Sequence, residues 1–334
     1  MGSWLVLGGT RFLSHAVAAV AVARGHEVVC VARGESGRVP DGATLLVADR
    51  DVPGALDPLR GRRFDAAVDV ATMSLPWVRD ALDAVDAGHW TFVSTISVYA
   101  DPLTPGQGVD APLLDPLQDG SSPPPDRQPD AYGAIKVASE NAVRASHPRS
   151  LVVRAGLICG PGDRSDRFGY WPARFARGGR AVVPGVPDQP MQIVDVRDLA
   201  EWIVDSGERG LTGTVDGSGP RTTLGAVLDE IAAAVGAPDL ELVPVPPEAL
   251  VAAEVTPWAG PRSLPLWLPD THTGIAARDT TPAAAAGLRT RPIADTARAA
   301  LDHERTLGPD RTRRAGLAPA DESRLLTDRD AATT

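Results

Sequence analysis

Tyr132 and Lys136 lie four residues apart in a stretch, 131–146, whose pattern predicts a helix. Four residues are about one helical turn, so both side chains lie on the same helix face. Reducing a carbonyl requires a hydride for the carbon and a proton for the oxygen, and a tyrosine with an ordinary pKa of about 10 transfers protons poorly at neutral pH. A neighbouring ammonium favours the phenolate. We therefore predict that Tyr132 is a general acid and base and that Lys136 lowers its pKa; the alternative is a packing tyrosine beside a surface lysine.

Hydroxyl side chains follow the predicted strand 90–94, in the segment that precedes this helix. The ligand-binding edge of an open α/β sheet lies at the carboxyl ends of its strands. We predict that Thr95 positions the substrate oxygen and stabilises its developing charge. Ser94 is assigned to the cofactor and Ser97 to the substrate.

The segment 7–14 (LGGTRFLS) follows a short apolar run, 4–7, and leads into a helical pattern at 16–23. A dinucleotide fold places its phosphate-binding turn at this point, because small residues let the backbone approach the pyrophosphate and the helix N-terminus supplies free N–H groups. The glycine spacing is degenerate, since Gly8 takes the first position while Arg11 and Ser14 take the second and third. An ordinary strand–helix turn is the alternative. The predicted cofactor contacts here are Gly8, Gly9, Thr10, Arg11, Phe12 and Leu13.

The residues after the second predicted strand, 26–32, favour NADP as the cofactor over NAD. An NAD site usually carries an acidic residue about 20 residues after the glycine turn, where it binds the ribose 2′-hydroxyl. Here Arg33 follows the strand, and an arginine pairs well with a 2′-phosphate. Arg11 offers a second cation, and Asp49 a contact to the adenine amino group. The alternatives are a solvated Arg33 and a turn-forming Asp49.

Short apolar runs alternate with helical patterns through the first half of the chain. Strands with no polar face, joined through helices, predict an α/β fold with a Rossmann-like, doubly wound parallel sheet. The predicted strands are 4–7, 26–32, 44–48, 65–70, 90–94 and 150–154, and the predicted helices are 16–23, 77–87 and 131–146.

Two segments depart from this alternation. Residues 101–130 are rich in proline, glycine and aspartate, which predicts an irregular segment that is either an active-site lid or a tolerated insertion. Residues 306–334 are polar and predict a weakly ordered tail. We assign residues 1–162, with contributions from about 191–218, to a dinucleotide-binding domain, and 163–190 with 219–305 to a smaller C-terminal substrate lobe.

Composition excludes several classes of function. The formal net charge of −10 disfavours a nucleic-acid partner. Cys30 and Cys159 lie in apolar runs and predict buried, reduced thiols, and the scattered histidines predict no metal site. No stretch approaches a membrane span or a signal peptide, so we expect a cytoplasmic protein without a membrane partner.

Together these motifs resemble the extended short-chain dehydrogenase/reductase family, also called the NAD-dependent epimerase/dehydratase family, over about residues 3–305. Residues 8–13 look like the GGTRF variant of its glycine turn, and 94–99 (STISVY) look like its signature after the fifth strand, with Thr95 at the catalytic position. Tyr132 and Lys136 match its YxxxK pair, followed by Glu140. The segment 154–161 resembles the stretch beside the nicotinamide, and 194–200 a structural landmark. The resemblance extends the predicted cofactor contacts to Arg50, Val70, Ala71, Ser94, Tyr132, Lys136, Ala155 and Leu157.

In this family the smaller lobe covers the cleft, so its arginines and aromatic residues are candidate substrate contacts. Arg164, Arg167 and Arg174 are able to meet an anionic group, and Trp171, Trp258 and Trp267 are able to line a pocket. A solvated arginine face and core tryptophans are the alternatives. Our substrate assignments are Ser97, Arg164, Arg167 and Trp171. Family members often dimerise through helices equivalent to 76–87 and 131–146, which allows a homodimer here.

Three functions remain open at this point. The first is an NADP-dependent oxidoreductase that reduces a ketone, or oxidises an alcohol, of a small metabolite. The second is a nucleotide-sugar epimerase with a retained NAD; a dehydratase is disfavoured because Ile96 and Ser97 stand where such enzymes carry an Asp–Glu pair. The third, from another class, is a non-catalytic nucleotide-sensing or RNA-associated protein on the same fold.

Overall fold

The computed structural model describes residues 1–117, 130–308 and 311–333. Seven parallel strands form its central sheet, in the order β3–β2–β1–β5–β7–β8–β13. They are β1 (Ser3–Leu7), β2 (Glu27–Ala32), β3 (Thr44–Val47), β5 (Ala66–Asp69), β7 (Trp90–Thr95), β8 (Ser150–Ala155) and β13 (Gly213–Gly217). The strand order turns in opposite directions on either side of β1, as in a doubly wound fold. The predicted α/β fold class is confirmed.

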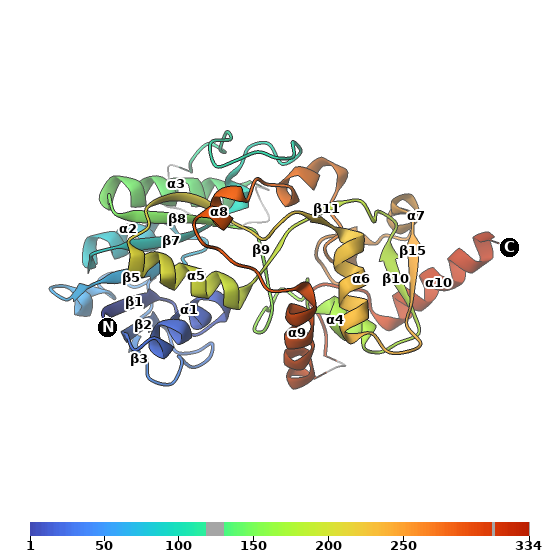
Figure 1. The fold of residues 1–334 in the computed structure, drawn as a ribbon, viewed down its shortest axis with the longest axis horizontal. Helices are drawn as coiled ribbons and strands as arrows, with labels where there is room; N and C mark the ends of the chain where they lie inside the picture. Colours follow the sequence, from blue (N-terminus) through green and yellow to red (C-terminus); the bar gives the residue numbers. More distant parts are fainter. Residues whose placement is uncertain (118–129, 309–310, 334) are drawn as a thin grey trace.

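Helices cover both faces of this sheet (Figure 1). Helices α1 (Phe12–Ala23) and α5 (Val196–Arg209) lie on one face, while α2 (Leu75–Ala84) and α3 (Ala131–Ser146) lie on the other. Alternate residues of β1 serve the two layers, since Trp4 and Val6 pack with α1 and α5 whereas Leu5 and Leu7 pack with α2. Burial on both faces is why these strands are uniformly apolar.

Two helices begin earlier than the sequence predicted. Helix α1 starts at Phe12 rather than at residue 16, so the helix N-terminus lies directly at the glycine turn. Helix α2 runs from Leu75 to Ala84 rather than over 77–87, because the Ser74 hydroxyl accepts a hydrogen bond from the Trp77 amide and so caps the start. A side-chain cap and a proline in the first turn are common start signals, and here they precede the apolar periodicity.

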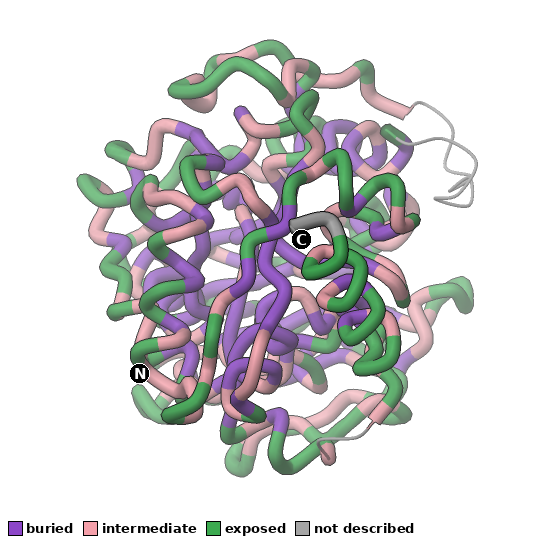
Figure 2. Tube along the Cα trace, turned by 90° about the vertical axis from the view of Figure 1, so that its right-hand side faces the viewer, coloured by how far each residue is buried: buried purple, intermediate pink, exposed green. Residues whose placement is uncertain are grey.

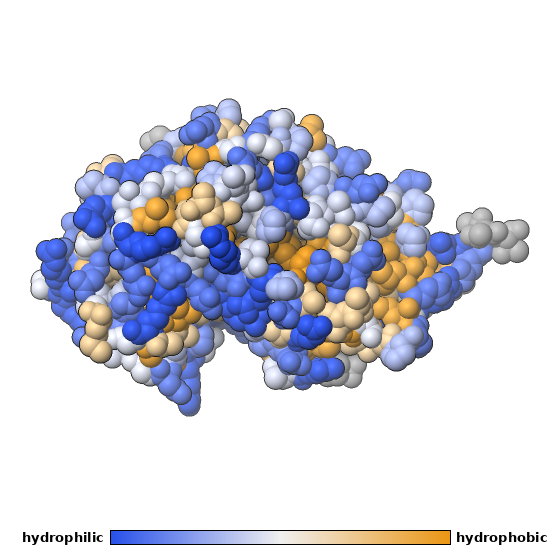
Figure 3. All heavy atoms as spheres, viewed as in Figure 1, coloured by the Kyte–Doolittle hydropathy of each residue, from blue (hydrophilic) through white to orange (hydrophobic). Residues whose placement is uncertain are grey.

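A second, smaller lobe is built from residues that follow β8 (Figure 1). Its core packs α4 (Tyr170–Phe175), α6 (Leu224–Val235) and α9 (Ile293–Leu307) against a parallel pair, β10 (Arg180–Pro184) and β15 (Glu241–Val245). Apolar side chains gather over this lobe, whereas the sheet half is largely polar outside (Figure 3). The remaining short elements are β4 (Arg63–Phe64), β6 (Asp86–Ala87), β9 (Leu157–Cys159), β11 (Pro190–Met191), β12 (Ile193–Asp195), β14 (Thr222–Thr223), α7 (Pro247–Ala252), β16 (Thr256–Pro257), β17 (Ser263–Leu264) and α8 (Thr281–Ala285).

The expectation of a weakly ordered tail was wrong. Residues Pro319–Thr333 form helix α10, which lies at the surface of the lobe with its outer turns exposed (Figure 2). Leu325 is buried in the lobe core, and the buried Glu322 pairs with Arg174 of α4 at 2.7 Å. The polar composition of this segment concealed these two anchoring positions.

The segment after β7 is irregular where the structure describes it. An isolated bridge joins Leu113 of this segment to Tyr99. The Asp101 carboxylate accepts hydrogen bonds from the amides of Leu103 and Thr104. The lid hypothesis concerns residues 101–130, of which 118–129 lie outside the described residues, so it stays a prediction. Among the described helices, none is both long enough and apolar enough to cross a membrane.

Candidate active site

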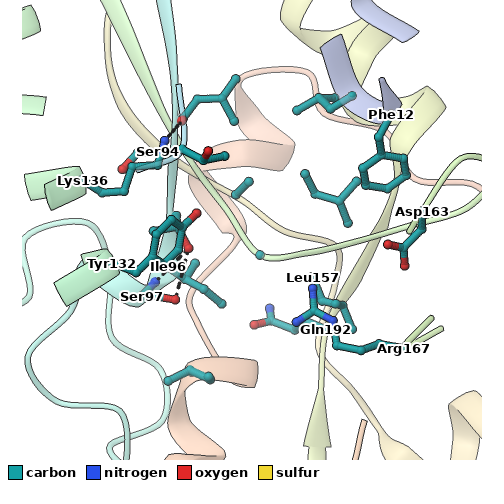
Figure 4. A pocket seen from close by; sticks show the side chains of 18 of the residues that line it. Phe12, Ser94, Ile96, Ser97, Tyr132, Lys136, Leu157, Asp163, Arg167 and Gln192 are labelled. Carbon is teal, nitrogen blue, oxygen red and sulfur yellow. Dashed lines mark hydrogen bonds between the residues drawn. The ribbon is translucent and has the colours of Figure 1, made fainter. Parts of the chain in front are cut away.

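A cavity of about 500 Å³ lies between the carboxyl edge of the sheet and the smaller lobe. Figure 4 shows Tyr132, Lys136, Ser94 and Ser97 on one side of it and Phe12, Asp163 and Arg167 on the other. Of the predicted site residues, the lining includes Arg11, Phe12, Leu13, Val70, Ser94, Thr95, Ser97, Tyr132, Lys136, Ala155, Leu157 and Arg167. The motifs found separately in the sequence therefore meet at one place.

Tyr132 and Thr95 form the hydroxyl pair of this cavity. Burial raises the pKa of Tyr132, while a side-chain hydrogen bond with Thr95 and the positive charge of Arg167 act to lower it. The Thr95 hydroxyl also contacts the Ser97 hydroxyl at 3.2 Å and accepts from the Ser97 amide. Arg167, from the other lobe, is therefore a cation that acts on the phenol and that the sequence did not indicate for this role. The role of Lys136 in lowering this pKa stays a prediction.

Lys136 is buried beneath the tyrosine and is held by the sheet. Its Nζ donates to the carbonyl oxygens of Ala71 at 2.5 Å and Val93 at 2.6 Å, and it lies 4.5 Å from the centre of the Phe92 ring. Burial lowers the pKa of Lys136 to about 8, against the opposing charges of Asp69 and Glu140. An ammonium has three protons, so one remains for a group in the cavity.

The sequence carries a further signal for this position, which the motif analysis did not use. Lys136 is the single lysine of the chain, and all the other cationic positions among the 33 Lys and Arg residues are arginine. An ammonium is compact and has a pKa that responds to burial, whereas a guanidinium stays charged and needs room for its planar fork. The exception thus falls where a small, buried cation fits between two carbonyls.

The turn before α1 has the backbone conformation that a dinucleotide requires. Gly8 and Gly9 have φ values of +132° and +102°, and a Cβ on Gly9 would lie 2.4 Å from Cys30 Sγ. Arg11 at the N-cap makes no side-chain cap, so the first amides of α1 stay free at the cavity wall. Ser14, at the third glycine position, fits by donating its hydroxyl to the Arg11 carbonyl at 2.8 Å. These residues fit a nicotinamide dinucleotide, with its pyrophosphate at the helix N-terminus.

The side chains predicted to bind the adenosine end of the cofactor differ in whether they bond to other residues of the chain. Arg33 is exposed, its nearest carboxylate being Glu35 at 3.8 Å, and its charge acts on that of Arg11. Asp49 accepts from the amide of Asp51, which is the turn-forming alternative. Arg50 is committed elsewhere, because it pairs with Asp69 at 3.1 Å and donates to the Trp77 carbonyl at 2.5 Å. The prediction of Arg50 as a cofactor contact is therefore corrected to a structural role at the end of β5.

The smaller lobe supplies cavity residues that sequence reasoning missed, among them Asp163 and Gln192. Trp258, which the sequence offered as a pocket residue, also lines the cavity. Both carboxylate oxygens of Asp163 accept from Ser165, and burial raises the pKa of Asp163. The Gln192 side-chain amide forms hydrogen bonds with the backbone of Gly219 and Arg278, which fix its position in the cavity lining.

Two other substrate assignments in the lobe are corrected. Trp171 is fully buried in the lobe core, and its indole N–H donates to the Pro265 carbonyl at 3.0 Å, so it does not reach the cavity. Arg174 pairs with Glu322 beneath α10. Arg164 is exposed and lies outside the cavity lining, so only Arg167 of the three arginines faces a substrate.

A buried ion network supports the floor of the site. Glu140, four residues after Lys136, accepts from Ser94 at 2.6 Å and pairs with Arg154 at 2.8 Å. Tyr99 donates to Asp216 at 2.6 Å, and Arg278 pairs with the same carboxylate at 3.1 Å. The network joins β7, α3, β8 and β13 to the segment around residue 278 and so fixes the end of β7 that carries Thr95.

The cysteines lie in the buried positions that the sequence predicted. Both cysteines are free and buried, and burial raises the pKa of the Cys30 thiol to about 12. Within the described residues, no group of three or more histidine, cysteine, aspartate or glutamate side chains is placed to hold a metal ion.

Comparison with solved structures identifies the fold. The enzyme WbmH of Bordetella bronchiseptica in complex with NAD+ superposes with a TM-score of 0.63 at 17% identity, over 92% of this chain and 99% of that chain. The UDP-glucuronic acid 4-epimerase of Bacillus cereus with NAD gives a TM-score of 0.63 at 14% identity, over 91% of this chain and 97% of that chain. The UDP-glucose 4-epimerase of Thermus thermophilus with NAD gives a TM-score of 0.59 at 18% identity, over 91% of this chain and 99% of that chain.

The chain has the fold of these three NAD-bound enzymes, two of which are named as epimerases. No protein-family model matches the chain, and no curated protein matches it. At these identities the likeness concerns the fold, so the reaction must be argued from the site.

Proposed function

We propose that this chain is a nicotinamide-dependent enzyme that oxidises and reduces a secondary alcohol of a sugar-like substrate, and that its net reaction is epimerisation on a retained NAD. The observation that carries the proposal is the meeting of Thr95, Tyr132 and Lys136 in one cavity beside the glycine turn. The NAD bound by the three structural neighbours, and the epimerase activity in the names of two of them, favour epimerisation over net reduction.

The residues divide the work as follows. A bound nicotinamide supplies the site that accepts and returns a hydride. The Tyr132 oxygen takes the hydroxyl proton of the substrate during oxidation and returns it during reduction. Thr95 holds the substrate oxygen by its hydroxyl, since it lies in the cavity lining with Tyr132. Lys136 binds a cofactor ribose hydroxyl with its remaining proton and places positive charge below the phenol.

The cofactor content of the protein tests this proposal first. An epimerase that returns its hydride keeps the cofactor, so protein purified without added nucleotide should release NAD on acid extraction. UDP-glucose, UDP-glucuronic acid and UDP-N-acetylglucosamine, the substrates in the neighbours' names, are then offered while NMR follows the sugar ring. We expect an epimer to form without net NADH. Tyr132→Phe should abolish it while the retained NAD stays bound.

A second function is favoured by one specific observation, the exposed Arg33 beside Arg11. Two cations suit a 2′-phosphate, and the acidic residue nearest to Arg33, Glu35, is an exposed side chain 3.8 Å away. The second candidate is therefore an NADP-dependent reductase of a small ketone. NADPH binding at least ten times tighter than NADH, lost in Arg33→Ser, would support this candidate. Consumption of NADPH with no epimer formed would replace the first proposal by the second.

A further inference from the structure

Arg167 differs from every other buried or half-buried arginine that the structure describes before helix α10. Each of the others has a carboxylate oxygen within 4.0 Å, and Arg167 has none. The paired arginines are Arg50, Arg154, Arg174, Arg180, Arg197, Arg262, Arg278, Arg291, Arg311 and Arg313. The Asp163 carboxylate is near enough for the charge of Arg167 to act on its pKa, but it does not form an ion pair with the guanidinium. A half-buried cation with no carboxylate in direct contact is costly, so its retention at the cavity wall indicates an anion that arrives from outside.

The Arg167 side chain is fixed with its outer nitrogens facing the cavity. Its Nε donates to the Ser165 hydroxyl at 3.1 Å, and its guanidinium carbon lies 4.7 Å from the centre of the Trp258 ring. Figure 4 shows the guanidinium ending in the cavity, across from Tyr132. Among the described residues, neither Nη1 nor Nη2 has a hydrogen-bond acceptor. A stacked, oriented fork with two unused donors suits a planar, two-oxygen anion.

The charges around the cavity limit this anion to one negative charge. Lys136 is bound to two carbonyls, and Arg11 belongs to the pyrophosphate turn. The Asp163 carboxylate also lies in the lining and repels a second negative charge. A carboxylate balances the single guanidinium, whereas a phosphate monoester brings up to two charges.

We infer that Arg167 and Trp258 form a carboxylate subsite, so that the substrate is an acid whose reacting alcohol faces Tyr132. The position of that alcohol rests on the proposed function, but the binding of the carboxylate does not. Asp163 takes part as a positioning residue, because Ser165, which orients the Arg167 Nε, donates its hydroxyl to Asp163 Oδ2 at 2.9 Å.

Tryptophan fluorescence tests the subsite without a known substrate. Five of the seven tryptophans are buried, and the half-buried Trp77 has both the Asp51 carboxylate and the Arg50 guanidinium beside it. Its quenching is the same in both proteins of a pair that differ only at residue 258. The difference between wild-type protein and Trp258→Phe therefore isolates Trp258. We expect iodide to quench Trp258 several-fold more efficiently, relative to neutral acrylamide, in wild-type protein than in Arg167→Gln. Arg167→Lys should retain most of the difference, and the matched control Arg164→Gln should retain all of it.

Competition at constant ionic strength identifies the anion. Acetate should protect Trp258 from iodide, while acetamide, of the same shape without charge, should not. Equal protection by acetamide, or iodide quenching unchanged in Arg167→Gln, would overturn the subsite. Protection by inorganic phosphate at a tenth of the acetate concentration would overturn the choice of a carboxylate. The epimer assay is separate, so loss of the subsite would leave the Tyr132 proposal standing, and the reverse also holds.

Discussion

The ammonium of Lys136 lies 2.5 Å from the carbonyl oxygen of Ala71, which is 65 residues away in sequence. This bond joins helix α3 to the end of β5 and places a charge in a dry part of the site. The same burial that fixes the cation also weakens its hold on the proton, because a low dielectric disfavours the charged form.

The first prediction concerns this proton. Burial lowers the pKa of Lys136 to about 8 in the folded chain, and the unfolded value is 10.5. Between these values the unfolded chain binds more protons, so the free energy of unfolding rises with pH through this range, by at most about 3 kcal/mol. Because Lys136 is the single lysine, protein labelled with lysine that carries ¹³C only at Cε gives one side-chain signal. Its NMR titration should have a midpoint near 8.

Lys136→Met supplies the matched control for stability. Urea unfolding gives the free energy of unfolding of wild-type protein and of this variant at several values of pH from 7 to 10. All other titratable groups are present in both proteins, so their contributions cancel in the difference between the two free energies. The free energy of unfolding of the wild-type protein should increase, relative to that of the variant, as pH rises. An NMR midpoint above 10, or a difference that does not change with pH, contradicts the argument.

A second prediction links Arg167 to the pH dependence of turnover. The positive charge of Arg167 lowers the pKa of Tyr132, against the effect of burial. Alcohol oxidation uses the phenolate, so kcat/KM rises with pH up to that pKa. Arg167→Gln removes the charge, and the rise should move to higher pH. Arg167→Lys should restore it, and Arg164→Gln should leave it unchanged. A rise that stays at the wild-type pH in Arg167→Gln would assign the titration to another group.

The fold was predictable because its signals are local. Six of the seven sheet strands are short runs that the sequence predicted, whereas β13 (GTVDG) has no apolar run and was not predicted. The boundaries of α3 agree with the prediction because both its N-terminal Ala131 and its last turn before His147 fall at changes in the pattern. The site was half predictable for the same reason. Thr95 and the Tyr132–Lys136 pair belong to local motifs on one edge of the sheet.

The other half of the site depends on contacts between distant segments. Trp258 is brought to Arg167 by the packing of the smaller lobe, and no spacing rule relates the two. Trp171 failed as a substrate residue because the short helix α4 turns it inward, where the Pro265 carbonyl satisfies its N–H. Arg50 failed because its partner Asp69 lies at the end of another strand. Which arginine lacks a partner is a property of the folded chain only.

A third prediction concerns the glycine turn. Gly9→Ala should cost about 3 kcal/mol of stability, because φ is +102° and the new Cβ would lie 2.4 Å from Cys30 Sγ. Gly61→Ala is the matched control, since φ is +76° there and a Cβ would meet nothing within 4 Å. It should cost about 1 kcal/mol, from the backbone alone.

Cys30→Ala in the Gly9→Ala background should recover part of the lost stability, because it removes the sulfur from the collision. Urea unfolding measures all four proteins, and NADH titration should show weaker binding only for the Gly9 variants. Equal losses for Gly9→Ala and Gly61→Ala would mean that the turn is not closely packed on β2.

The last prediction concerns helix α10. Glu322 of this helix accepts from Arg174 Nε at 2.7 Å and from the Val182 amide at 3.1 Å, and both charged side chains are buried. Glu322→Gln leaves the guanidinium without its counter-ion, which should cost about 3 kcal/mol. Asp330→Asn, which alters the exposed pair with Arg180 on the same helix, should change stability little. Because the penalty comes from an uncompensated buried charge, replacing both partners in Arg174→Met/Glu322→Leu should recover much of the loss in urea unfolding. A double variant as unstable as Glu322→Gln would show instead that the carboxylate is needed for the Val182 amide and the end of β10, and the role of Glu322 would then be that of a backbone acceptor.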